Sequence, residues 1–201
     1  GLQVATYGSY YRMDASEQEG LSFATVLETA VELGAPTIRV WAGDKPSQDA
    51  DEAHWQEIIH LSRCIADMAD AAGIDIVYEF HGGTLTDTNA TALRLVREVN
   101  HPRVKSGWQP ATNMSDAERL GGLRSLLPWL ANIHVFYWRP NFANRRPLRE
   151  GLDAWTGYLQ VAAETGRGHW TMIEFVREDS PEAFLEDAAA LKELIGRVAG
   201  G

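Results

Sequence analysis

Six short apolar segments alternate along the chain with longer segments of helical periodicity, at a spacing of roughly 30 to 40 residues. The apolar segments are 2–7, 36–42, 74–78, 104–109, 131–138 and 170–175. Helix-start signals follow them, such as the capping box of Ser115 and Glu118 and the N-cap and proline of Ser180-Pro181. Repeated parallel βαβ units give this order. The pattern therefore predicts an α/β fold, with residues 1–201 in a single domain.

Polar or aromatic side chains end nearly every predicted strand. They are Arg39, Trp41, Glu79, His81, Trp108, Gln109, His134 and Glu174. An open doubly wound sheet gathers its site at one switch point, whereas a barrel rings its site with the ends of all its strands. The spread of these residues favours a (β/α) TIM-type barrel. Because a full barrel has eight units, six parallel strands predict an N-terminally incomplete barrel, and we expect a segment ahead of Gly1.

Composition restricts the partners of the chain. The formal net charge is −10, from 28 acidic and 18 basic residues, and no dense Lys/Arg cluster is present, which argues against a nucleic-acid partner. No apolar run of about 18 residues exists, so we expect no membrane partner. The single cysteine, Cys64, permits no disulfide within the chain and is typical of a reducing, cytoplasmic location. A small-molecule substrate remains.

The stretch 74–88 has the strongest functional pattern. Its apolar strand ends in Glu79, Phe80 and His81 and is followed by two glycines. Side chains alternate along a strand, so Glu79 and His81 point the same way. If they face the interior, they deliver two metal ligands or acid and base groups together, whereas the plainer alternative is a pair of solvent-facing loop residues.

Glu79, His134 and Glu174 each stand at a predicted strand end. Two carboxylates and an imidazole suit a divalent cation such as Mg²⁺, Mn²⁺ or Co²⁺, while the lack of cysteine ligands argues against a structural zinc. A metal at this point would polarise a substrate carbonyl and hydroxyl while a carboxylate moves a proton. The three residues come from different units, so spacing alone does not bring them together.

Six motifs, in this order along the chain, carry a family resemblance: GLQVATYGSYY, GAPTIRVWAG, YEFH, WQP, NIHVF and TMIEF. Together they resemble the xylose isomerase-like barrel family, the sugar phosphate isomerase/epimerase group. The resemblance implies a divalent metal (Mn, Mg, Co or Zn) held by Glu, Asp, His and Glu, with the glutamates as the proton-transfer pair. By position these are Glu79, His134 and Glu174, and the aspartate falls on Gln109. An uncharged amide there implies weaker metal binding.

The remaining candidates concern the substrate. Arg39 at a strand end either binds a phosphate or carboxylate or forms an ion pair with Glu79. Trp41, Trp108 and Trp138 are predicted to stack on a sugar ring, although core or rim packing is expected for at least one of them. His81 is predicted to contact the substrate beside them.

The leading functional prediction is a metal-dependent sugar or sugar phosphate isomerase or epimerase. Removal of a proton next to the carbonyl by Glu79 or Glu174 would form an enediolate. A retaining glycosidase that uses the same two carboxylates is one alternative, and a non-catalytic sugar-binding module that lost its metal, as Gln109 indicates, is another. Six strands leave two open parallel edges, which predicts a homodimer.

Overall fold

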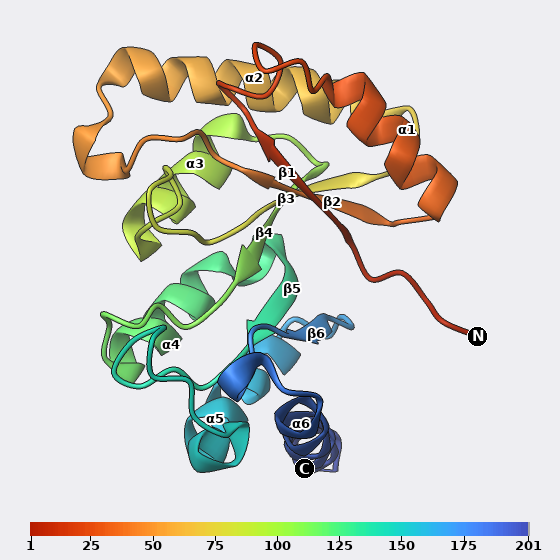
Figure 1. The fold of residues 1–201 in the computed structure, drawn as a ribbon. Helices are drawn as coiled ribbons and strands as arrows, with labels where there is room; N and C mark the ends of the chain where they lie inside the picture. The colour runs from red at the N-terminus through yellow and green to blue at the C-terminus, as the bar shows by residue number, and fades with distance from the viewer. Residues whose placement is uncertain (201) are drawn as a thin grey trace. The chain divides into compact units, whose positions relative to one another are not determined.

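The computed structural model describes residues 1–200. Contacts within the chain divide it into two compact units, Gly1–Gly107 and Trp108–Gly201. Each unit repeats the strand-then-helix order that the sequence predicts (Figure 1). The expectation of one domain over residues 1–201 stays a prediction.

The first unit contains a parallel sheet in the order β1-β2-β3-β4. Its strands are β1 (Tyr7–Arg12), β2 (Thr37–Trp41), β3 (Asp75–Tyr78) and β4 (Val104–Trp108), the last of which ends at the boundary of the unit. Ile38 of β2 pairs with Ile76 of β3, and both side chains are fully buried. Strands that are buried on both faces appear in the sequence as continuous apolar runs, and such runs made these strands recognisable.

Three helices accompany this sheet: α1 (Phe23–Leu33), α2 (Glu52–Asp70) and α3 (Asn89–Val99), with a short 3₁₀ helix at Ser47–Asp49. Helix α1 contacts β1 and β2, and α2 contacts β3 and α3. Ser22 caps α1 by accepting from the Thr25 N–H, and Gly34 ends it with φ 64°. Only glycine adopts that angle without steric cost. Residues at the two ends of α1 therefore determine where the helix begins and ends.

The second unit pairs β5 (Leu130–Val135) with β6 (Trp170–Ile173) in parallel. Its helices are α4 (Asp116–Leu126), α5 (Leu152–Ala163) and α6 (Pro181–Ala199), with 3₁₀ turns at Leu127–Trp129, Leu148–Gly151 and Arg177–Asp179. Helix α5 packs between α4 and α6. The capping box of Ser115 and Glu118 and the start of α6 after Ser180 are confirmed.

The predicted strand boundaries are wrong in three places. The first strand runs from Tyr7 to Arg12, not over 2–7; the apolar Leu2 and Val4 are exposed, and the backbone pairs with β2 from Tyr7 onward. Strands β5 and β6 end at Val135 and Ile173, before the predicted 138 and 175. Apolar pattern alone does not supply a pairing partner, and pairing defines a strand. Among residues 1–200, no helix is long and apolar enough to span a membrane.

Candidate functional site

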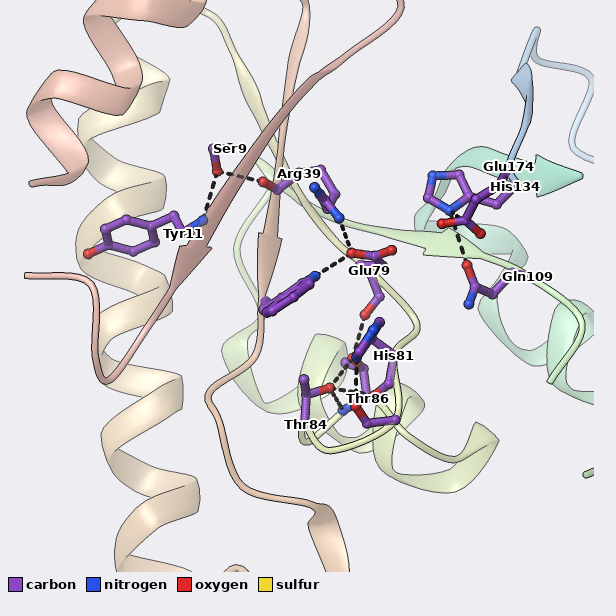
Figure 2. A network of polar contacts seen from close by, with 12 residues as sticks. Ser9, Tyr11, Arg39, Glu79, His81, Thr84, Thr86, Gln109, His134 and Glu174 are labelled. Atoms are coloured by element: carbon purple, nitrogen blue, oxygen red, sulfur yellow. Dashed lines mark hydrogen bonds and ion pairs between the residues drawn. The ribbon is translucent and has the colours of Figure 1, made fainter. Parts of the chain in front are cut away.

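Glu79 directly follows β3 and is only 4% exposed. Its Oε2 accepts hydrogen bonds from Arg39 Nη1 and from Trp41 Nε1 (Figure 2). The two donors lie two residues apart on β2, so they project from the same face of that strand. A buried carboxylate without partners would be costly, and the neighbouring strand provides a cation and an N–H to compensate it. Of the two alternatives for Arg39, the structure shows the ion pair.

His81 lies against Trp41 in the same unit. The two rings stack, with centroids 4.7 Å apart and planes 23° from parallel. Trp41 therefore contacts both residues that follow β3, because its N–H donates to the Glu79 carboxylate and its ring face lies on the His81 imidazole. An aromatic surface next to a buried carboxylate is suited to the apolar face of a sugar ring.

Two threonines tie the loop after β3 to its own backbone. Thr86 Oγ1 donates to the Glu79 carbonyl at 2.5 Å, Thr84 Oγ1 donates to the His81 carbonyl at 2.8 Å, and Gly83 turns the chain with φ 80°. Hydroxyl groups that bond to nearby backbone are typical of tight turns. The sequence GGTLT thus fixes the backbone that presents Glu79 and His81.

In the second unit, His134 of β5 lies beside Glu174, the residue that follows β6. His134 Nδ1 is 3.4 Å from Glu174 Oε2, and the Glu174 N–H donates to the Val135 carbonyl at 3.1 Å. The side chains are 17% and 21% exposed. Glu174 Oε2 is itself buried and makes no hydrogen bond within residues 1–200. A buried acceptor without a donor is uncommon and points to a ligand or a proton-transfer role.

Gln109 contacts the imidazole of His134. Its Oε1 is 3.0 Å from His134 Nδ1, so the ring donates from Nδ1 and its Nε2 carries the lone pair in the neutral form (Figure 2). An oxygen that accepts from the second ring nitrogen is what metal-ligating histidines have in general. Gln109 therefore fits either as a ligand or as the group that sets the tautomer of His134.

Aromatic side chains surround the loops that follow β5 and β6. Trp138 stacks on Phe136 with centroids 3.5 Å apart, and its Nε1 donates to the Phe175 carbonyl at 3.2 Å. Phe142 and Phe175 are about half exposed and meet edge to face at 5.5 Å. Phe175, directly after Glu174, has φ 45°, an uncommon angle for a bulky residue and one found at functional sites.

A groove of about 550 Å³ lies between these loops. It is lined by Phe142, Ala143, Asn144, Arg145, Arg146, Arg177, Glu178 and Asp179. Arg145 joins the loops, because its Nη1 donates to Asp179 Oδ1 at 2.5 Å and to the Val176 carbonyl at 3.2 Å. Its guanidinium also lies 4.3 Å from the Phe142 ring centroid. The groove thus contains three arginines and two acidic residues, and each arginine forms an ion pair with an acidic side chain.

A polar network anchors the loop after β5. Asp116 Oδ1 accepts from Tyr158 at 2.8 Å, from Arg119 at 2.9 Å and from Arg139. Burial raises the pKa of Asp116, but the hydrogen bonds from Tyr158 and Arg139 outweigh it and leave that pKa below its usual value. Burial, and then the hydrogen bond to Asp116, raise the pKa of Tyr158 to about 12. The carboxylate therefore stays ionised and holds Arg139.

The structure gathers the predicted residues into two clusters, one in each unit. Arg39, Trp41, Glu79 and His81 form the first cluster, and Gln109, His134 and Glu174 form the second. Trp108 is 2% exposed and packs edge-on against Trp155 and Tyr158. That burial gives Trp108 a packing role, and its contact with a sugar stays a prediction.

Sequence reasoning missed Tyr10 and Arg145. Tyr10 lies over the Arg39 guanidinium, and Arg145 bridges two loops. The Arg-rich loop 139–149 was a signal for Arg145, whereas Tyr10 carries no signal of its own, because a tyrosine beside a strand is common.

Comparison with known proteins places these clusters in context. The family model of the xylose isomerase-like TIM barrel matches residues 1–194. The 3-dehydroshikimate dehydratase of Bacillus anthracis is 31% identical over 161 residues, which is 69% of this chain and 55% of that protein. The chain thus spans about half the length of the curated relative that it matches.

Solved structures show the same fold. A xylose isomerase-like TIM barrel protein from Mycobacterium smegmatis, in complex with magnesium, superposes with a TM-score of 0.75 at 18% identity, over 98% of this chain and 75% of that one. The D-psicose 3-epimerase from Clostridium cellulolyticum H10, solved with D-tagatose, gives 0.70 at 18% identity, over 97% and 78%. The predicted fold class and the predicted family resemblance are both confirmed.

Proposed function

Because the chain belongs to the xylose isomerase-like TIM barrel family, we propose that it is an enzyme that removes a proton next to the carbonyl of a small polyhydroxylated substrate. An isomerase or epimerase of a sugar or sugar phosphate is the leading form of this proposal. The observation that carries it is the contrast between two strand-end glutamates: Glu79 is clamped by Arg39 and Trp41, while Glu174 has a buried oxygen without a hydrogen bond among the described residues.

The donor set that we assign to a divalent metal is the one that the strand-end positions in the sequence indicate: Glu79, His134 and Glu174. Two carboxylates and one imidazole fit Mg²⁺, Mn²⁺, Co²⁺ or Zn²⁺. The buried Glu174 Oε2 and the tautomer of His134 set by Gln109 both favour this assignment. When bound, the metal would polarise the substrate carbonyl and neighbouring hydroxyl.

The residues of this chain divide the remaining work. Glu174 takes the proton from the carbon beside the carbonyl, because it is the carboxylate less restrained by hydrogen bonds. Glu79, held by Arg39 and Trp41, orients the substrate, and the protonated Glu174 then returns its proton to the enediolate at the neighbouring carbon. The stacked rings of Trp41 and His81 form the surface that contacts the sugar ring.

The second candidate is a dehydratase of a hydroxylated keto acid. The 31% identity to 3-dehydroshikimate dehydratase favours it. The first step is the same proton removal. The C–O bond of the hydroxyl one carbon further then breaks as the C=C bond forms, and a carboxylic acid protonates the leaving oxygen to give water.

Deuterium exchange tests the shared step. Purified protein with Mn²⁺ is incubated in D₂O with ketoses, including D-psicose and D-tagatose, and with 3-dehydroshikimate, and loss of the C–H signal is followed by NMR. Glu79→Gln and Glu174→Gln are expected to slow the exchange by about 10² to 10⁴-fold. Glu57→Gln, on an exposed face of α2, is the matched control and should match wild type.

The outcomes separate the alternatives. Exchange accompanied by an epimer or isomer supports the leading form, and aromatic absorbance from 3-dehydroshikimate supports the dehydratase. Hydrolysis of glycosides that survives chelation would replace both with the two-carboxylate glycosidase. Sugar binding without turnover or metal binding would indicate the sugar-binding module. The predicted homodimer is tested separately, by measuring the molar mass of the protein in solution by light scattering.

A further inference from the structure

Strand β1 contains a bulge beside the Arg39 and Glu79 pair. Gly8 pairs with Arg39 and Tyr11 with Val40, so Ser9 and Tyr10 are inserted against β2. The buried Ser9 hydroxyl fixes this insertion, since it donates to the Arg39 carbonyl at 2.7 Å and accepts from the Tyr11 N–H at 3.2 Å (Figure 2). Bulges re-aim side chains and are frequent next to active sites.

The inserted Tyr10 has a conformation that its residue type disfavours. Its φ is 55°, in the left-handed region that glycine or asparagine enters with little cost. Its side chain is 64% exposed, so burial of the ring does not compensate the strain. Strained residues persist where the surrounding structure holds them, and they gather at functional sites.

The strain places the Tyr10 ring against the guanidinium of Arg39. Arg39 Cζ lies 4.6 Å from the ring centroid, and Trp41 meets Tyr10 edge-on at 5.6 Å. Gly8 also leaves room for the guanidinium, because a Cβ at that position would lie 3.0 Å from Arg39 Nη2. The bulge thus brings Gly8 and the Tyr10 ring next to Arg39, while Arg39 donates to Glu79.

We infer that Tyr10 is a positioning residue: the strained bulge places its ring over Arg39. Arg39 in turn fixes the orientation of the Glu79 carboxylate. The ring replaces water on one face of the guanidinium, and both the cation–π contact and the ion pair gain strength as water is removed. The inference rests on the proposed function in one respect: the catalytic use of Glu79. The contact of Tyr10 with Arg39 does not depend on it.

Three variants separate the ring from the backbone angle. Tyr10→Phe keeps the ring, Tyr10→Ala removes it and keeps a Cβ at positive φ, and Tyr10→Gly removes both. Hydrogen exchange of the Arg39 side-chain N–H groups, assigned with Arg39→Lys, is measured by NMR. We expect exchange at least tenfold faster in the Ala and Gly variants and unchanged in Phe. Unchanged exchange in Tyr10→Ala would overturn the inference.

The melting temperature, in contrast, is expected to depend on the backbone angle φ at position 10. Tyr10→Gly should melt about 2 °C above Tyr10→Ala, since alanine at positive φ remains strained. A Gly variant that melts below the Ala variant would overturn the strained-bulge part. Asn100→Gly is the matched control, because Asn100 also has positive φ (47°) but caps α3, and it should leave Arg39 exchange unchanged.

Turnover completes the test. The kcat for deuterium exchange should fall about tenfold in both Tyr10→Ala and Tyr10→Gly, with little change in KM, and Tyr10→Phe should restore it. If activity follows melting temperature instead of the ring, Tyr10 is merely structural and the inference fails. If wild type exchanges no substrate proton, the proposed function fails, while the NMR result still decides whether Tyr10 positions Arg39.

Discussion

Two glutamates occupy equivalent places after strands, Glu79 after β3 and Glu174 after β6, but their surroundings differ. Glu79 is 4% exposed and receives two donors from β2. Glu174 is 21% exposed, approaches His134 at 3.4 Å and keeps a buried oxygen without a hydrogen bond in the described chain. The neighbouring strand makes the difference, because β2 presents Arg39 and Trp41 where β5 presents His134.

The comparison teaches that residue type and position do not determine what a carboxylate does. A carboxylate with fixed donors is held as a charge, and changing its protonation breaks those bonds. A carboxylate with an unsatisfied oxygen accepts a proton or a ligand at little structural cost. We therefore regard Glu79 as the fixed group of the proposed site and Glu174 as the variable one.

The largest expected effect concerns the clamp on Glu79. Arg39→Met leaves a buried charge without its cation and should lower the free energy of unfolding by about 3–5 kcal/mol in urea titrations. Arg39→Met/Glu79→Met should be less destabilised than Arg39→Met alone, since it removes both charges. Arg97→Met, exposed on α3, should stay within about 0.5 kcal/mol of wild type. An Arg39→Met protein as stable as wild type would contradict the view that Glu79 is held more firmly than Glu174.

The next effect concerns the second cluster. Gln109→Asp adds a charge next to His134 and should tighten Mn²⁺ binding by about tenfold in a calorimetric titration. Gln109→Leu removes the acceptor for His134 Nδ1 and should weaken binding. Equal Mn²⁺ affinity in all three proteins would mean that Gln109 contributes neither as a ligand nor through the tautomer of His134.

Glu174→Gln sharpens the comparison from the other side. Because Glu174 Oε2 makes no hydrogen bond among residues 1–200, this variant should unfold within about 0.5 kcal/mol of wild type. Thermal and urea unfolding of the purified variant would measure it. A loss as large as that of Arg39→Met would show that Glu174 is as firmly built into the fold as Glu79.

The smallest effect is a pH dependence near the start of β6. Burial lowers the pKa of His169 from its ordinary 6.5, against the opposing contact with the Ala131 carbonyl. The unfolded chain therefore takes up the proton first, and stability should fall as the pH drops below about 6.5. The melting-point difference between pH 8 and pH 5.5 should shrink by about 1 °C in His169→Gln. An equal difference in both proteins would contradict this assignment.

Local signals made most of the fold predictable. The Ser22 cap, the Gly34 stop and the capping box at Ser115 depend on residues within one turn, so the sequence displays them directly. The first strand was misplaced to 2–7 because its position depends on pairing with Ile38, about thirty residues away. Pairing across such distances leaves no trace in a short sequence window.

The candidate residues were predictable as types and only partly as partners. Strand-end positions identified Glu79, His134 and Glu174, but the sequence left Arg39 equally able to hold a substrate or to pair with Glu79. Trp108 looked like a member of the strand-end set and is buried against Trp155. Burial depends on which helix covers a side chain, and periodicity does not state that.

By itself, the sequence determined the order of strands and helices, the family and the chemical types at the strand ends, because each is encoded by near neighbours or by motif order. Only the tertiary structure decided that Arg39 clamps Glu79, that Glu174 keeps an unsatisfied oxygen and that Tyr10 lies strained over Arg39. The reason is physical: hydrogen bonds, burial and ring contacts depend on distances between residues that are far apart in the chain.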